Sequence, residues 1–242
     1  MKKTIPIILC FIFASIVCDA EGYDQASLVK LLNEKKCHRC DLKWVDLEGA
    51  DLEKADLSWA VLFKANLKKI NLKDADLKRA YLINANLKGA NLRGADMQGA
   101  SLKNADLEGA DLKGANLQMA RGKEINLEKA DLKGAYLKGA DMKDANFKGA
   151  DLEKADLRGA DLYWTNFDGA NLKGADLFGA FLYTASLKGA NLEGANLEGA
   201  NLEGANLKGA YMRGCYLRGA KLDGADLQGA DLKGANFDRV LR

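Results

Sequence analysis

A pair of cysteines near the start of the chain carries most of its candidate chemistry. The stretch Cys37-His38-Arg39-Cys40 places two thiols three residues apart, with the only histidine of the chain between them. Such a pair can form a disulfide, act as a redox centre or supply ligands to a metal ion. A redox Cys-X-X-Cys usually opens a helix in a βαβ unit, and zinc needs four ligands where three donors are local. We assign a structural disulfide, keep redox and metal binding as alternatives, and expect no resident metal or cofactor.

The rest of the sequence offers little catalytic chemistry. One histidine in 242 residues leaves no Ser/His/Asp arrangement, and we find no phosphate-binding loop or metal-ligand cluster. The formal net charge is +2, so the chain is neither a polyanion nor a strong polycation. These observations predict a non-enzymatic protein that binds proteins and no nucleic acid.

The two cysteines must be positioned by a five-residue repeat that runs without insertion or deletion through residues 40–239. In the unit Ala190-Asn191-Leu192-Glu193-Gly194 we name the residues, in order, the small, outward, centre, turn and corner positions. From Leu42 to Phe237 there are 40 centres, of which 33 are Leu. Ala fills 34 of the 40 small positions, and Asp or Asn fills 30 of the 40 outward positions.

This pattern predicts an all-β coil. In an extended segment alternate side chains share a face, so the small residue and the centre point inward and the Asp or Asn points outward. Gly fills 23 of the 40 corners, as a type II turn with positive φ at its second central residue requires. A corner every five residues closes a square coil after four units, so 40 units predict about ten coils.

The unit Ala-(Asp/Asn)-Leu-X-Gly strongly resembles the pentapeptide repeat proteins over about residues 37–242. The resemblance implies a right-handed quadrilateral β-helix. It implies little about function, since a few members mimic DNA and protect DNA gyrase and most have no assigned activity. A similar Cys-X-X-Cys-Asp-Leu entry occurs in exported members, which adds to the disulfide interpretation of Cys37 and Cys40.

The N-terminal residues predict two further segments. Residues 1–20 read as a secretory signal peptide, with Lys2 and Lys3 before an apolar stretch and cleavage after Ala20. We therefore expect a periplasmic or secreted protein without stable membrane insertion after cleavage. Residues 21–39 hold a helix capped by Asp24, which would cover the open first coil, followed by the cysteine pair. Residues 40–242 form the β-helix.

One of the four faces differs from the other three. We call the face that carries the centres Leu42 to Leu222, in steps of twenty, the aromatic face. Its corners carry Gly only at 204 and 224, so we expect a different turn type there. Exposed apolar groups gathered on one side mark an interaction surface, and stacking between coils is the alternative explanation. The candidate interaction residues are Trp44, Phe63, Tyr81, Tyr163, Trp164, Phe181 and Tyr183.

Three further features give local expectations. Gly122 is the only centre without a side chain, and Ile125 is expected to fill part of the resulting hole. Cys215 lies at a small position and should be a buried, unpaired thiol. Two outward basic columns could attract anions, although a solvated surface is the usual explanation: Lys73, Arg93, Lys113 and Lys133, and Lys103, Lys123 and Lys143.

The C-terminal end leaves a coil without a partner. Either Phe237, Val240 and Leu241 fold over this end, or two molecules meet there, and the resemblance favours a homodimer. In sum, we predict an exported, non-enzymatic protein-interaction scaffold. A DNA mimic that binds gyrase is an alternative disfavoured by the signal peptide and the near-neutral charge. A Cys-X-X-Cys redox protein is the other alternative.

Overall fold

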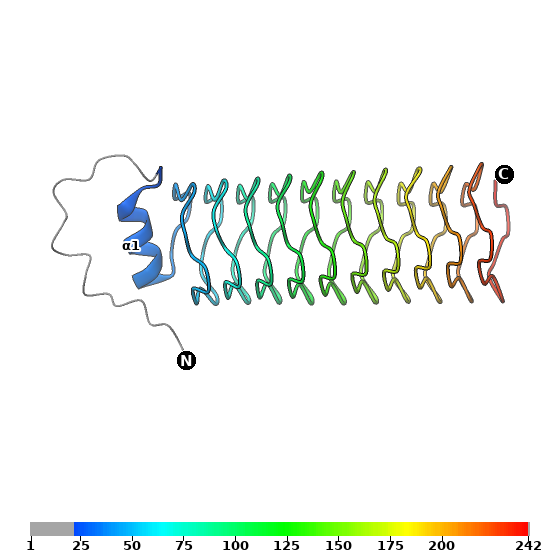
Figure 1. Cartoon of the computed structure of the whole chain (residues 1–242), viewed down its shortest axis with the longest axis horizontal. Helices are drawn as coiled ribbons and strands as arrows, with labels where there is room; N and C mark the ends of the chain where they lie inside the picture. The colour runs from blue at the N-terminus through cyan, green and yellow to red at the C-terminus, as the bar shows by residue number, and fades with distance from the viewer. Residues whose placement is uncertain (1–21, 242) are drawn as a thin grey trace.

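A single helix precedes a long solenoid in the computed structural model, which describes residues 22–241. Figure 1 shows α1, Gln25–Glu34, at one end of a row of stacked coils, with the C-terminus at the other end. The described residues form no extended strand. Parallel bridges of single residues instead join positions twenty apart, from Lys36↔Asp56 to Lys221↔Leu241. The predicted signal peptide, residues 1–20, lies outside the described residues.

The sequence of α1 sets both of its ends. Asp24 is the N-cap, and its carboxylate accepts the amides of Ala26 and Ser27 at 3.2 and 3.1 Å. Lys35 ends the helix in the left-handed region, and its amide donates to the Leu31 carbonyl at 2.9 Å. The Leu31 side chain is fully buried in the core. Among the helices of residues 22–241, none is long and apolar enough to cross a membrane.

A regular five-residue unit with Asp or Asn at its outward position has an acceptor for every backbone amide. In the unit Asn71–Ala75, the amides of Leu72 and Asp74 donate to carbonyls of the next coil at 2.8 Å each. The Asn71 amide donates to the preceding coil at 2.9 Å, and the Ala75 amide closes the turn onto the Leu72 carbonyl at 3.1 Å. The Lys73 amide donates to Oδ1 of Asn71 at 3.2 Å. The outward Asp or Asn is thus a backbone cap, which explains its frequency.

The corners show that one expectation was wrong. The described corners of the repeat have positive φ whether or not they are Gly, including Trp44 at 57°, Trp164 at 57° and Thr184 at 52° on the aromatic face. The aromatic face therefore uses the same turn as the other faces. The reason is closure: a square coil needs the same bend at every corner, and the hydrogen bonds to adjacent coils hold even an unfavourable residue there.

The core is filled by the centres and the small residues, except at Gly122, where neighbouring side chains fill the space of the missing one. A Cβ added to Gly122 would lie 2.5 Å from Sδ of Met142 and 3.2 Å from Cγ2 of Ile125. Ile125 therefore fills part of the hole, as expected, and Met142 fills more of it, which we did not expect. Farther along, Phe147 and Phe167 are both fully buried and stack with ring centroids 4.9 Å apart.

The C-terminal coil continues the ladder. The Leu241 amide donates to the Ala220 carbonyl and its own carbonyl accepts the Leu222 amide, both at 2.9 Å, so Leu241 does not fold over the end. Phe237 and Val240 lie at inward positions and remain partly exposed. Within the described chain, the amides of Leu227, Leu232 and Phe237 have no coil to bond to. This edge of the last coil is therefore unpaired among the described residues.

Candidate interaction surface

The cysteine pair forms the predicted disulfide, and it does so inside a repeat unit. Cys37 and Cys40 are bonded, with Cα atoms 5.2 Å apart. The Cys37 amide donates to the Asp56 carbonyl in the next coil, and Arg39 has the positive φ of a corner, 59°. Cys37 therefore occupies a centre and Cys40 the following small position. Extending the five-residue frame back from Leu42 would have assigned Cys37 to a centre.

The disulfide lies between the helix and the first coil. Cys37 is fully buried and Cys40 is 8% exposed, and Sγ of Cys37 lies 3.3 Å from the Ser27 carbonyl oxygen of α1. His38 points outward, with Nδ1 2.8 Å from Oγ of Ser58. Among residues 22–241, no group of three or more His, Cys, Asp or Glu side chains could hold a metal ion.

Cys215, the remaining described cysteine, is a buried free thiol, as the sequence predicts. Its Sγ lies 2.8 Å from the Leu192 carbonyl oxygen. Burial raises the pKa of this thiol to about 12. A thiol with so high a pKa is a poor nucleophile, so Cys215 is a core residue.

The aromatic face differs from the others in its backbone caps. Every outward Asp or Asn in residues 40–239 except Asp161 accepts the amide of the turn residue two positions later. On the aromatic face the outward positions are often other residues. The turn amides there that have no acceptor in the described chain are those of Phe63, Ile83, Lys103, Lys123, Tyr163, Tyr183 and Asp223. On the other three faces of the repeat they are those of Lys138, Arg213 and Arg218.

The first aromatic cluster lies next to the helix. The rings of Trp44 and Phe63 meet edge to face with centroids 5.8 Å apart. Trp44 is half exposed, and a Cβ on Gly22 would lie 2.3 Å from its Cε3 atom, so the segment before α1 packs on this ring. Tyr81, also a candidate, is 44% exposed but makes no ring contact within the described chain. Part of this cluster therefore serves the N-terminal packing.

The second cluster is larger and belongs to two adjacent coils. The ring of Tyr163 lies at the middle, 5.7 Å from Trp164, 6.1 Å from Phe181 and 5.8 Å from Tyr183 between centroids. Trp164 is 56% exposed, and Phe181 and Tyr183 are also exposed. The ammonium group of Lys143 lies 5.9 Å from the Tyr163 ring centroid. Packing between coils accounts for some of this contact but leaves the outer ring surfaces in solvent.

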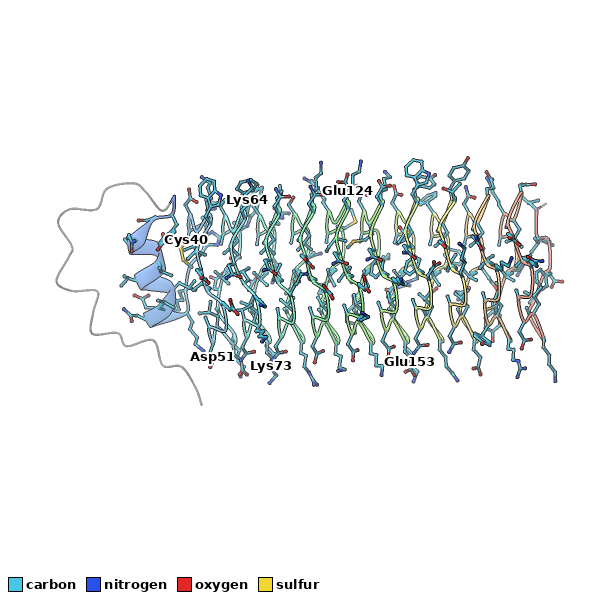
Figure 2. The ribbon with its side chains drawn as sticks, in the orientation of Figure 1. Cys40, Asp51, Lys64, Lys73, Glu124 and Glu153 are labelled. Atoms are coloured by element: carbon cyan, nitrogen blue, oxygen red, sulfur yellow. A yellow bond between two sulfur atoms is a disulfide. The ribbon has the colours of Figure 1, made fainter. Side chains whose placement is uncertain are left out.

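The structure does not bring the two clusters together. Trp44 and Trp164 are 120 positions apart, or six turns of twenty residues, which corresponds to roughly 29 Å at about 4.8 Å per turn. Both clusters nevertheless lie on one side of the molecule. Figure 2 shows Lys64 and Glu124, two corners of this face, along the same edge, with Asp51, Lys73 and Glu153 on the opposite edge.

One buried polar atom lies beside the second cluster. Oδ1 of Asp161 is buried and has no hydrogen-bond partner in the described structure, while Oδ2 lies 2.7 Å from the ammonium group of Lys143. The Tyr163 amide that this oxygen would cap is the uncapped amide noted above. The Trp164 amide of the same unit donates to its acceptor at 3.2 Å, slightly longer than the 3.1 Å at Asn104. The irregular backbone and the aromatic cluster thus coincide.

The chain is a parallel solenoid of capped five-residue units with a disulfide in its first coil. These features define a class of β-helical repeat protein. The profile described as Pentapeptide repeats matches the chain in 8 copies, at residues 40–79, 80–118, 125–163, 145–182, 165–204 and 200–239. The chain belongs to the pentapeptide repeat family. Membership supports the right-handed β-helix that the resemblance implies. Comparison with curated proteins gives no match.

Several solved structures resemble the chain. HetL, a pentapeptide repeat protein involved in heterocyst differentiation regulation from the cyanobacterium Nostoc sp. strain PCC 7120, is 34% identical, with 88% of this chain and 94% of that chain covered and a TM-score of 0.43. AT2G44920, from the Arabidopsis thaliana thylakoid lumen, is 34% identical over 40% of this chain and 65% of its own, with a TM-score of 0.25. QnrB1, a plasmid-mediated fluoroquinolone resistance protein, is 21% identical over 79% and 89%, with a TM-score of 0.31.

Proposed function

We propose that this chain is an exported, non-enzymatic scaffold that binds a protein partner through the aromatic face. The observation that carries the proposal is the second cluster, in which Phe181 replaces the outward Asp or Asn and remains 44% exposed. A replacement that served only the fold would keep the cap, since an uncapped amide weakens the unit. Exposed aromatic groups beside free backbone donors suit a partner that supplies apolar contacts and acceptors.

The ends of the solenoid fit this role. We propose that α1 is a cap, because Leu31 covers the first coil and an uncovered edge would pair with other chains. About ten coils of twenty residues would then form one rigid support for the aromatic face. Burial of Cys37 and Cys40 favours a disulfide that holds the entry over a redox centre, which needs an accessible sulfur. Export to a periplasm or the exterior agrees with this disulfide.

We further propose a homodimer through the open C-terminal edge. Phe237, Val240 and Leu241 are left partly exposed there, beside backbone amides without acceptors. A second copy, related by a two-fold axis, would pair this edge and cover these side chains. Capping of the other end by α1 would stop the assembly at two.

The test is association of the purified protein with proteins that co-purify from its own compartment. We expect the double variant Tyr163→Ser and Phe181→Ser to lose the partner and keep the fold. The control is Tyr136→Ser, which removes a ring that is 48% exposed at the same outward position on another face. Unchanged association in the double variant, or an equal loss in the control, would exclude the aromatic face as the partner surface.

A further inference from the structure

An ordered series of ion pairs runs along the solenoid. A basic residue at a turn position reaches an outward Asp eighteen positions later, in the next coil. The distances are 3.0 Å for Lys78–Asp96, 2.7 Å for Lys113–Asp131 and 3.0 Å for Lys133–Asp151. Lys143–Asp161, on the aromatic face, follows the same rule at 2.7 Å. The rule applies where the residue eighteen positions later is Asp; some turn lysines, such as Lys68 and Lys148, have Asn there instead.

Lys103 does not follow this rule, because the residue eighteen positions later is a cation and not an Asp. The residue eighteen positions after Lys103 is Arg121, whose backbone is bridged to Ser101 in the same coil as Lys103. Neither Lys103 nor Arg121 makes an ion pair within the described residues. Lys123 stacks one coil beyond Lys103 and adds a third cation. Two adjacent coils therefore gather three cations on one face.

The acids near this cluster form few direct ion pairs with it. Lys123 lies 3.6 Å from Glu124 and 3.9 Å from Asp144, and each of these side chains is more than a third exposed. Pairs of that kind are weak. Asp141 follows Arg121 in the ladder and stands eighteen positions after Lys123, but it makes no ion pair with either among the described residues; it accepts the Lys143 amide at 3.4 Å. Lys103 and Arg121 thus have no direct ion-pair partner among the described residues.

The same two units lack their backbone caps. Ser101 and Arg121 stand at outward positions, so the turn amides of Lys103 and Lys123 have no acceptor among the described residues. In most units a carboxylate or amide oxygen fills this place. The cluster thus presents two N–H donors and three cations where the fold normally supplies an Asp or Asn acceptor. An external carboxylate would restore both the missing cap and the missing ion pair.

The geometry points to a carboxylate-binding site at Lys103, Arg121 and Lys123 that takes an acidic peptide segment of a protein partner. This inference rests on the proposed function, because the site lies on the aromatic face. A peptide fits better than a small anion, since free amides continue along the face to Ile83 and Phe63 and could bond its further acceptors, and these two side chains could meet its apolar groups. The site would set the register of the partner along the face.

The test is binding of a fluorescein-labelled hexaglutamate peptide to the purified protein, measured by fluorescence anisotropy at low and at physiological salt. We expect saturable, salt-weakened binding that Arg121→Asp and Lys103→Ala each weaken about tenfold, as loss of a charge-assisted hydrogen bond predicts. The matched control is Lys113→Ala, which removes the same charge from a regular ion pair and should leave binding unchanged. Melting of each variant verifies that it is folded, and Arg121→Asp should melt no lower than wild type, because it restores the ladder.

Three results would overturn the site: no peptide binding, an equal loss in Lys113→Ala, or binding at these residues of inorganic phosphate or a sulfated oligosaccharide without the peptide. The test is separate from that of the proposed function. Tyr163→Ser with Phe181→Ser should leave hexaglutamate binding unchanged. If that variant lost its partner and the wild type did not bind hexaglutamate, the proposed scaffold function would stand and the carboxylate-binding site would be excluded.

Discussion

The thioether of Met142 lies in the space that the missing side chain of Gly122 leaves in the core. A Cβ on Gly122 would lie 2.5 Å from Sδ of Met142, and Ile125 approaches from the same unit. The core therefore conserves volume across two coils, although one centre is empty. The flexible, unbranched Met side chain can extend into such a gap.

This packing predicts an unusual cost for truncating Ile125. Ile125→Ala should lower the free energy of unfolding by at least about 1 kcal/mol more than an ordinary Ile→Ala change, because Gly122 has no side chain that could collapse into the cavity. The measurement is denaturant unfolding. Ile70→Ala is the control, since Ile70 is also a fully buried residue at a small position. Equal losses in the two variants would contradict the prediction.

The positive φ at the corners predicts a stabilising substitution. Thr184 is β-branched and has φ of 52°, a conformation that costs such a residue about 1–2 kcal/mol. Thr184→Gly should therefore raise the free energy of unfolding by about 1 kcal/mol, partly offset by the flexibility of Gly in the unfolded chain. The melting temperature measures this. Asn84→Gly should gain less, because Asn tolerates the left-handed region; an equal or larger gain there would refute the argument.

The outward caps predict a graded loss. Asn71 accepts the Lys73 amide, donates to Asp51 at 2.8 Å and accepts from Asn91 at 2.9 Å. Asn201 accepts only the amide of its own turn residue, at 3.0 Å. Asn71→Ala should cost about 2 kcal/mol and Asn201→Ala about 1 kcal/mol, at roughly 1 kcal/mol per net hydrogen bond with partial replacement by water. Denaturant unfolding of both variants measures the two losses in free energy of unfolding, which can be compared if the dependence on denaturant concentration is the same for both.

The disulfide predicts local weakening when it is removed. Cys37→Ala with Cys40→Ala should cost about 2 kcal/mol, since the closed loop is short. The loss should be local, so hydrogen exchange should accelerate at the Arg39 and Leu42 amides, while amides in the middle of the solenoid keep their rates. Cys215→Ala is the control, because Ala is the usual residue at its position. Unchanged exchange at Arg39 would mean that the hydrogen bonds of the coil hold the entry alone.

The buried thiol predicts a pH dependence. Burial raises the pKa of Cys215 to about 12 from an ordinary value of 9.0, so the folded state binds the thiol proton more tightly than the unfolded state does. The stability linked to this group is full below pH 9 and is lost as the pH rises from about 9 towards 12. A maleimide probe at pH 8 should therefore label Cys215 only in denaturant. Fast labelling of the native protein would show that this part of the core opens.

The sequence predicts most of the fold because its frame is unbroken. The Leu and Ala positions specify the core, and the Asp or Asn between them specifies the outer surface. It did not predict the turn at Trp44 and Thr184, because local preference opposes the φ that the whole coil imposes. The caps were not predicted, since the alternation of side chains placed the Asp or Asn on the outer surface and gave it no partner in its own backbone.

The candidate site was predicted only in part. Aromatic residues twenty positions apart correctly indicated one face, because stacking in register follows from the constant period. The contacts of Tyr163 with Trp164, Phe181 and Tyr183 needed coordinates, as did the contact of Trp44 with Gly22. The place of Cys37 at a centre was available from the frame itself. The lack of an acid opposite Lys103 became visible only after the ion pairs had defined the rule that it breaks.

Because the coils stack in a fixed register, the position of a residue in the sequence determines the face on which it lies. Removing twenty residues would shorten the rod by one coil and leave every later side chain on its own face. Removing five residues between Trp44 and Tyr163 would rotate all later residues by a quarter of a turn, so that the two side chains would no longer lie on the same face. A solenoid of this kind can therefore change length by whole coils and keep its surface pattern, while a single lost unit would divide that pattern between two sides.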